Sequence, residues 1–264
     1  MNKILVPVDF SATSLNALLY TIHLFKEVST EIVVLHTYGA HSTAFHMKSM
    51  DNILEGDAQR EMDDFLNKVP KLKRDTILTP KLVKSGAVAT ITSMGDTGEY
   101  DLIIMGTTGA SGLKKVFIGS VAGGVMSTTK APVIVVPSGY QFSKLDTILF
   151  AVSEVPYSDD SIVEPLRMLA QLHQAKINML HITNNEIANI DEQINPLRDM
   201  SPSVNYLFGA DDINQSLKDY LAEHDNDLLC LIRSKKAFLS QLFDASVTME
   251  QTFSCPVPLL ILQN

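Results

Sequence analysis

Four short apolar segments from the first half of this 264-residue chain recur, in the same order, in the second half. The matching pairs are residues 3–9 with 147–153, 34–37 with 179–182, 101–105 with 227–231, and 131–133 with 255–257. Self-similarity in a fixed order indicates an internal duplication. We therefore predict two tandem copies of one fold, residues 1–140 and 145–264, with a short linker around residues 138–145.

Within the first copy, short apolar strands alternate with amphipathic helices. The expected strands are residues 3–8, 31–37, 76–83, 101–105 and 133–136. The expected helices begin near residues 11–14, at a cap formed by Asp51, near residues 85–86 and near residues 119–120. Strands that are apolar on both faces are typical of a buried parallel sheet, and the intervening apolar residues recur at helical spacing. The pattern predicts an α/β fold, with each copy a doubly wound, five-stranded parallel sheet flanked by helices.

A glycine-rich loop follows the fourth expected strand and leads into the next helix. Its spacing is Gly106-x2-Gly109-x9-Gly119-Ser120, with Gly112 as an additional glycine. Glycine lets the backbone approach a ligand closely, and a helix N-terminus offers unpaired N–H groups to an anion. The loop lacks the Lys-Ser/Thr pair of a Walker loop and the spacing of a dinucleotide fingerprint. It predicts a phosphate site of another kind, although any single glycine could simply serve a surface turn.

This spacing resembles the nucleotide loop of ATP-binding members of the universal stress protein family. Residues 3–11 resemble the first strand of that family with its Asp, and residues 131–137 resemble its fifth strand. The resemblance implies strand order 3-2-1-4-5, with a ligand at the carboxyl ends of strands 1 and 4. It also implies ATP as the ligand, Mg²⁺ as a further candidate, and a role as a stress-response regulator.

The same resemblance assigns residues of the first copy to the nucleotide. Those expected around adenine and ribose are Pro7, Val8, Asp9, Thr37, Met105 and Gly106. Those expected around the phosphates are Gly109, Gly119, Ser120 and the N–H of Val121. A helix cap is the alternative role for Asp9. For His36, which lies in an apolar strand, burial with a satisfied ring is favoured over catalysis.

The second copy lacks this chemistry. The residues in place of Pro7, Asp9, Gly106, Gly109 and Gly119 are Ala151, Ser153, Ile232, Lys235 and Ala245, and only Ser246 matches, opposite Ser120. A branched side chain at a position built on glycine keeps the backbone away from a phosphate. We therefore expect a degenerate copy that does not bind nucleotide. A basic loop with Arg233, Lys235 and Lys236 is open to another anion, and a solvated loop is the favoured interpretation.

Charge is divided unevenly between the copies. The net charge of −9 splits into +1 for residues 1–144 and −10 for residues 145–264. Such an acidic surface repels a polyanion, which argues against nucleic acid as a partner. No apolar run approaches the ~20 residues of a membrane span, and the N-terminus resembles a strand rather than a signal peptide. We expect a cytoplasmic protein in which Cys230 and Cys255 are buried thiols rather than metal ligands.

The sequence shows no pairing of a nucleophile with a base. His41 and His46 lack a third zinc ligand, and Lys114 and Lys115 are interpreted as solvated loop charges rather than a phosphate clamp. We therefore do not predict an enzyme. Three functions are left: an ATP-binding regulator, a nucleotide-independent scaffold, or a slow ATPase or phosphate acceptor at Ser120. Relatives pair through their fifth strands, so an intramolecular pseudo-dimer is expected, with a homodimer also open.

Overall fold

The computed structural model describes residues 2–39, 48–72, 75–107, 119–184, 189–209, 212–233 and 255–264. The elements of the first half are β1 Asn2–Pro7, α1 Ala12–Leu24, β2 Thr30–Tyr38, α2 Lys48–Leu66, β3 Thr76–Lys84, α3 Ala87–Gly95, β4 Leu102–Gly106, α4 Ser120–Thr128 and β5 Val133–Val136. Those of the second half are β6 Thr147–Val152, η1 Asp160–Val163, α5 Glu164–His173, β7 Lys176–Thr183, α6 Asp191–Ile194, η2 Asn195–Met200, β8 Ser203–Phe208, α7 Ile213–Glu223, β9 Leu228–Arg233 and β10 Leu259–Gln263. The predicted alternation of strands and helices is confirmed.

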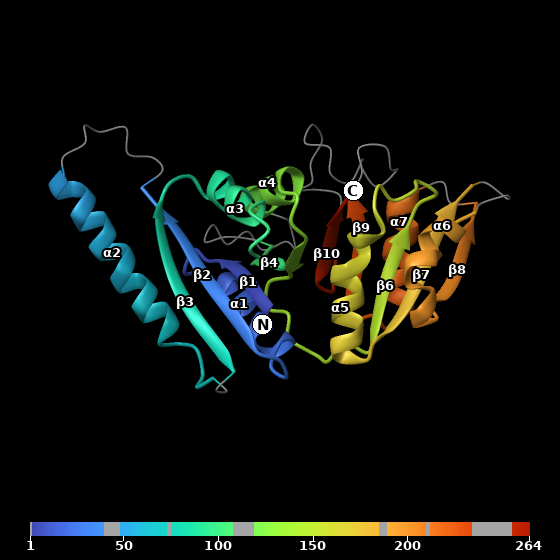
Figure 1. The fold of residues 1–264 in the computed structure, drawn as a ribbon, viewed down its shortest axis with the longest axis horizontal. Helices are drawn as coiled ribbons and strands as arrows, with labels where there is room; N and C mark the ends of the chain where they lie inside the picture. Colours follow the sequence, from blue (N-terminus) through green and yellow to red (C-terminus); the bar gives the residue numbers. More distant parts are fainter. Residues whose placement is uncertain are drawn as a thin grey trace.

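The strands of both halves form one continuous ten-stranded sheet (Figure 1). Its order is β3-β2-β1-β4-β5-β10-β9-β6-β7-β8, so each half has the predicted order 3-2-1-4-5. Strands within each half are parallel, whereas β5 and β10 pair antiparallel, with Leu260 opposite Ile134. The fifth strands therefore join the two halves within one chain.

Helices cover both faces of this sheet. Helices α1, α2 and α5 contribute buried side chains to one core cluster, and α3, α4 and α7 contribute to the cluster on the other face. Alternate residues of each strand supply the two clusters, because successive side chains of a strand point to opposite faces. This arrangement is the doubly wound α/β fold that the sequence predicts.

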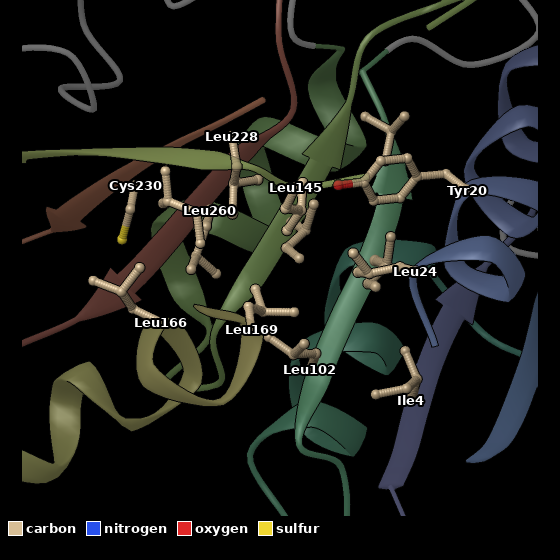
Figure 2. Packing of buried hydrophobic residues seen from close by; sticks show 14 of the residues in the cluster. Ile4, Tyr20, Leu24, Leu102, Leu145, Leu166, Leu169, Leu228, Cys230 and Leu260 are labelled. Carbon is tan, nitrogen blue, oxygen red and sulfur yellow. The ribbon is translucent and has the colours of Figure 1, made fainter. Parts of the chain in front are cut away.

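The first of these clusters runs through both halves. Figure 2 shows Leu24 and Leu102 of the first half together with Leu145, Leu169 and Leu260 from the part of the chain that follows β5. All five side chains are at most 1% exposed and belong to the same cluster. Burying one leucine side chain contributes roughly 1.5–3 kcal/mol. The two halves therefore share hydrophobic core as well as a strand pair.

The duplication is also visible in single hydrogen bonds. In the first half, Asp101 Oδ2 accepts a bond from the N–H of Lys3 at 2.8 Å. In the second half, Asp227 Oδ2 accepts a bond from the N–H of Thr147 at 2.9 Å. Each carboxylate thereby fixes the start of the first strand of its half beside the start of the fourth.

The predicted match between residues 131–133 and 255–257 is wrong by two residues. In the first half the carbonyl of Pro132 accepts a hydrogen bond from a β4 N–H at 3.0 Å. In the second half the carbonyl of Pro258, not Pro256, accepts the equivalent bond from β9 at 2.9 Å. The second copy contains two X-Pro dipeptides in succession, so its sequence fits both registers.

Helix starts were predicted with mixed success. Ser11 is the N-cap of α1 and Gly86 is that of α3, both within the expected ranges. Gly119 is the N-cap of α4, again as expected. The prediction that Asp51 caps the second helix was wrong, because α2 already begins at Lys48. An acidic residue is favourable anywhere in the first turn, so its presence does not define the first residue.

Candidate functional site

A cavity of about 300 Å³ lies at the carboxyl ends of β1, β2 and β4, beside the starts of α3 and α4. Doubly wound sheets bind ligands at this edge. The lining residues are Pro7, Val8, Asp9, Ser14, Leu35, His36, Thr37, Ala87, Ile91, Met105, Gly106, Thr107, Gly119, Ser120, Val121 and Ala122. Nine of the ten residues that the sequence assigned to the nucleotide belong to this lining, and Gly109 lies outside the described residues.

The end of β1 presents an exposed carboxylate with a fixed orientation. Asp9 Oδ1 accepts hydrogen bonds from the N–H of Ser11 at 3.2 Å and from its hydroxyl at 2.6 Å. Ser11 Oγ in turn accepts a bond from the N–H of Ser14 at 3.1 Å. Ser11 therefore caps α1, and Asp9 supports that cap without being the cap itself. The carboxylate is held at the cavity wall by a local network.

His36 lies beneath this turn in β2. Its Nδ1 is 2.9 Å from the carbonyl oxygen of Val8, and because a carbonyl only accepts, Nδ1 is the donor. The Phe10 ring stacks on the imidazole, with ring centroids 4.1 Å apart. Phe10 has a φ of 63°, a left-handed conformation that costs an ordinary residue about 1–2 kcal/mol. These contacts agree with a structural role for His36, which shapes the strand end from which Asp9 projects.

At the end of β4, Gly106 packs closely against the first turn of α1. A Cβ on Gly106 would lie 2.7 Å from Thr13 Cγ2 and 3.1 Å from the Thr13 carbonyl oxygen. The absence of a side chain at this position is therefore required by the fold, independently of any ligand. The sequence could not distinguish these two reasons for a glycine.

Thr107 follows Gly106 and was not among the residues predicted for the site. Its side chain is buried, it lines the cavity, and its hydroxyl oxygen has no hydrogen-bond partner among the described residues. A buried hydroxyl without a partner costs free energy. Its position beside Gly106 in a glycine-rich loop was the available signal. Ala87 and Ile91 of α3, which form an apolar wall, were likewise not assigned to the site.

The N-terminus of α4 faces the cavity. Gly119 is the N-cap and, having no side chain, supplies no side-chain cap to the first N–H groups of this nine-residue helix. Its own N–H donates to the carbonyl of Thr107. Ser120 and Val121 are exposed at the first two helical positions. The first N–H groups of a helix and its dipole favour a negatively charged group at this end.

The second half has a corresponding cavity at the carboxyl ends of β6 and β7, of about 430 Å³. His181 Nδ1 lies 2.9 Å from the carbonyl oxygen of Val152, which reproduces the contact of His36 with Val8. Arg233 Nη1 donates to Gln263 Oε1 at 2.9 Å, which ties the first residue of the predicted basic loop to β10. Lys235, Lys236, Ala245 and Ser246 lie outside the described residues, as do His41, His46, Lys114 and Lys115.

The two cysteines are buried free thiols, as predicted. Burial raises the pKa of Cys255 to about 12 and that of Cys230 well above its usual value, so neither forms a thiolate readily. Among the described residues no group of three or more His, Cys, Asp or Glu side chains is placed to hold a metal ion. In that same part of the chain, no helix combines the length and apolar character needed to cross a membrane.

The fold and the cavity define a tandem doubly wound α/β protein. Its first half has a ligand-sized cavity at the carboxyl ends of the parallel strands. The family model described as "Universal stress protein family" matches residues 1–137. This chain belongs to the universal stress protein family.

Similar proteins come from bacteria and archaea. A universal stress protein of Methanocaldococcus jannaschii is 27% identical over 137 residues, which cover 51% of this chain and 81% of the relative. The universal stress protein YxiE of Bacillus subtilis is 30% identical over 148 residues, covering 51% of this chain and 98% of the relative. A universal stress protein of Archaeoglobus fulgidus shares the fold over nearly the whole length, with a TM-score of 0.74, 17% identity and coverage of 99% and 98%.

Proposed function

We propose that this chain is a cytoplasmic ATP-binding regulator of a stress response. In this proposal, residues 1–140 form a universal stress protein domain that holds the nucleotide. Residues 145–264 form a degenerate domain of the same kind that does not bind nucleotide. ATP bound at the first cavity changes the surface around it, and a partner protein recognises that change.

The observation that carries the proposal is the convergence of the assigned residues on one cavity. Residues from three strand ends and one helix start, separated by more than a hundred positions in sequence, line the same hollow of about 300 Å³. That volume lies at the lower end of the roughly 300–1,000 Å³ usual for small-molecule sites. The apolar wall of Leu35, Ile91 and Met105 suits a ring, and a ribose hydroxyl could donate to Asp9.

The phosphate end of the nucleotide is supported by separate groups. The start of α4, where the N-cap Gly119 has no side chain to cap the helix, favours an anion. Thr107, whose hydroxyl has no partner among the described residues, belongs to the same lining. Mg²⁺ would supply charge balance for the phosphates, which are its usual ligands together with water. A dedicated protein cage of carboxylates is not needed for that role.

Nucleotide content tests the proposal. We would measure nucleotide in protein purified without added ATP and then titrate with ATP and Mg²⁺. Retained ATP or micromolar binding is expected in the parent, with loss in Gly119→Val and Gly109→Val. Gly56→Val is the matched control, because Gly56 is exposed in α2 and a Cβ there meets no atom within 4 Å. Absence of binding at millimolar ATP in the folded parent would overturn the proposal.

A nucleotide-independent scaffold is the second candidate, and the pairing of β5 with β10 favours it. This antiparallel contact makes the chain a pseudo-dimer with a continuous sheet. If the parent binds no ATP, the scaffold is the better account. Phosphate release, or a gain in mass at Ser120, would instead indicate the slow ATPase or phosphate acceptor. These two readouts can be taken from the same titration samples.

A further inference from the structure

The cavity of the second half differs from its counterpart in the chemistry of its walls. Its floor is apolar and is made by Ala151, Leu180, Ile182, Ile213 and Leu217. Ile213 begins α7 as Ala87 begins α3, so a larger apolar side chain replaces a small one at the same place. The space is a slot between β6, β7 and α7, with about 430 Å³ of volume.

A carboxylate–imidazole pair lies at the edge of this slot. Glu154 follows Ser153 as Phe10 follows Asp9, so a carboxylate takes the place of the ring that stacks on His36. His181 Nε2 lies 3.4 Å from Glu154 Oε1. His181 Nδ1 already donates to the carbonyl of Val152, so Nε2 is the ring nitrogen that faces Glu154.

The pair makes the edge of the slot an acceptor for hydrogen-bond donors. The Glu154 side chain is 42% exposed, whereas that of His181 is 4% exposed, so the carboxylate is the accessible partner. Carboxylate oxygens accept from hydroxyl and amino groups and repel phosphate. None of the described residues that line the slot is Lys or Arg. The described lining thus offers no Lys or Arg to an anion and one carboxylate to a hydrogen-bond donor.

We propose that this slot binds a flat, uncharged ring compound of nucleoside size that carries hydroxyl or amino donors and no phosphate. The ring would lie against the apolar floor, and its donors would face Glu154. The lining of the slot carries this inference, and only the choice of adenosine as the probe rests on the function proposed for the first half. An empty vestige of the duplicated site is the competing explanation.

Methyl-resolved NMR distinguishes the two cavities in the full chain. Isoleucine δ1-methyl labelling places probes at Ile182 and Ile213 in the slot and at Ile91 in the first cavity. Adenosine is expected to shift the first two signals saturably, with AMP about tenfold weaker because of its charge. ATP bound at the first cavity would instead shift the Ile91 signal. Lack of binding at either cavity is therefore observed independently of the other.

Three substitutions at exposed or half-buried positions sharpen the test. Glu154→Gln is expected to weaken adenosine binding at Ile182 severalfold, while Glu223→Gln, an exposed carboxylate at the end of α7, leaves it unchanged. Ile213→Trp fills the slot and should abolish the Ile182 shift in a protein whose circular dichroism is unaltered. If millimolar adenosine gives no saturable shift at Ile182 and Ile213, or if AMP binds as tightly as adenosine, the proposal is overturned.

Discussion

The imidazole Nε2 of His173 lies 3.0 Å from the main-chain oxygen of Leu24, so a side chain of the second half binds the last residue of α1 in the first. The carbonyls of the last helical turn have no partner within their own helix. His173 therefore satisfies one of these groups across the junction between the halves. The Phe142 ring of the linker lies beside it, with centroids 6.2 Å apart.

This contact predicts a pH-dependent stability of the junction. Burial lowers the pKa of His173 from its usual value of 6.5, so the folded state keeps the ring neutral where the unfolded state takes up a proton. Stability is fully present above pH 6.5 and falls as the pH goes down from 6.5 towards the lowered pKa. Urea unfolding of the parent between pH 7.5 and pH 5.5 measures this loss.

His173→Gln provides the control, because its amide can donate to the same carbonyl and does not titrate. The difference in unfolding free energy between parent and variant is expected to shrink on acidification, since only the parent gains a destabilising proton. Other histidines contribute equally to both proteins and cancel. A difference that is constant with pH would contradict the prediction. His173→Ala, which leaves the carbonyl unpaired, should cost about 1–3 kcal/mol at pH 7.5.

The carboxylate of Asp227 should matter more than that of Asp101. Asp227 Oδ2 accepts hydrogen bonds from the N–H groups of Asp146 and Thr147, at 2.8 and 2.9 Å. Asp101 Oδ2 accepts one from Lys3 at 2.8 Å. We expect Asp227→Ala to lower the unfolding free energy by about 1–3 kcal/mol and Asp101→Ala by about 1 kcal/mol. Asp227→Asn keeps an acceptor oxygen and should lose less, and an equal loss in Asn and Ala variants would count against the hydrogen-bond explanation.

Much of this architecture was predictable from the sequence, because its strongest signals are local. The parallel strands were recognised as short segments that are apolar on both faces. The two segments that begin at Asp101 and Asp227 gave the correct match between β4 and β9. The register at β10 was predicted wrongly, because residues 255–258 hold two prolines two positions apart and the first was matched to Pro132. The two registers differ in which proline carbonyl accepts the hydrogen bond from β9. That bond is a long-range contact, which the local sequence does not show.

The candidate site was predictable where a motif marks it and not where packing forms it. Nine assigned residues line the first cavity, whereas Thr107 was missed because its importance lies in a buried hydroxyl without a described partner. Glu154 was also missed. Its contact with His181 depends on how the residues after β6 pack against β7, which sequence spacing does not reveal. The adjacent loops, at residues 108–118 and 234–254, lie outside the described part of the chain.

Gly106→Ala should destabilise the protein whether or not nucleotide is present. The new Cβ would lie 2.7 Å from Thr13 Cγ2, and overpacking of this kind costs about 1–3 kcal/mol. Thr13→Ser removes that methyl group, so the double variant should recover part of the loss in thermal unfolding. Recovery would be incomplete, because the Thr13 carbonyl oxygen is also only 3.1 Å away. Additive effects of the two substitutions would show that the contact is not the cause.

The final prediction concerns the pairing of Leu260 with Ile134, which couples the halves. Leu260 is fully buried in the cluster that both halves share, so Leu260→Ala is expected to cost about 2–5 kcal/mol. If the halves unfold as one cooperative unit, this substitution in β10 must also lower the protection of distant amides in the first half. Hydrogen exchange of peptides covering β2 and β7 measures both halves in one experiment.

Leu18→Ala is the matched control, because Leu18 is equally buried in α1 of the first half. In a coupled protein, either substitution lowers the protection of β2 and β7 by similar amounts, since both strands then exchange through global unfolding. In an uncoupled protein, Leu260→Ala affects β7 alone and Leu18→Ala affects β2 alone. The second pattern would mean that the continuous sheet joins two independently stable domains.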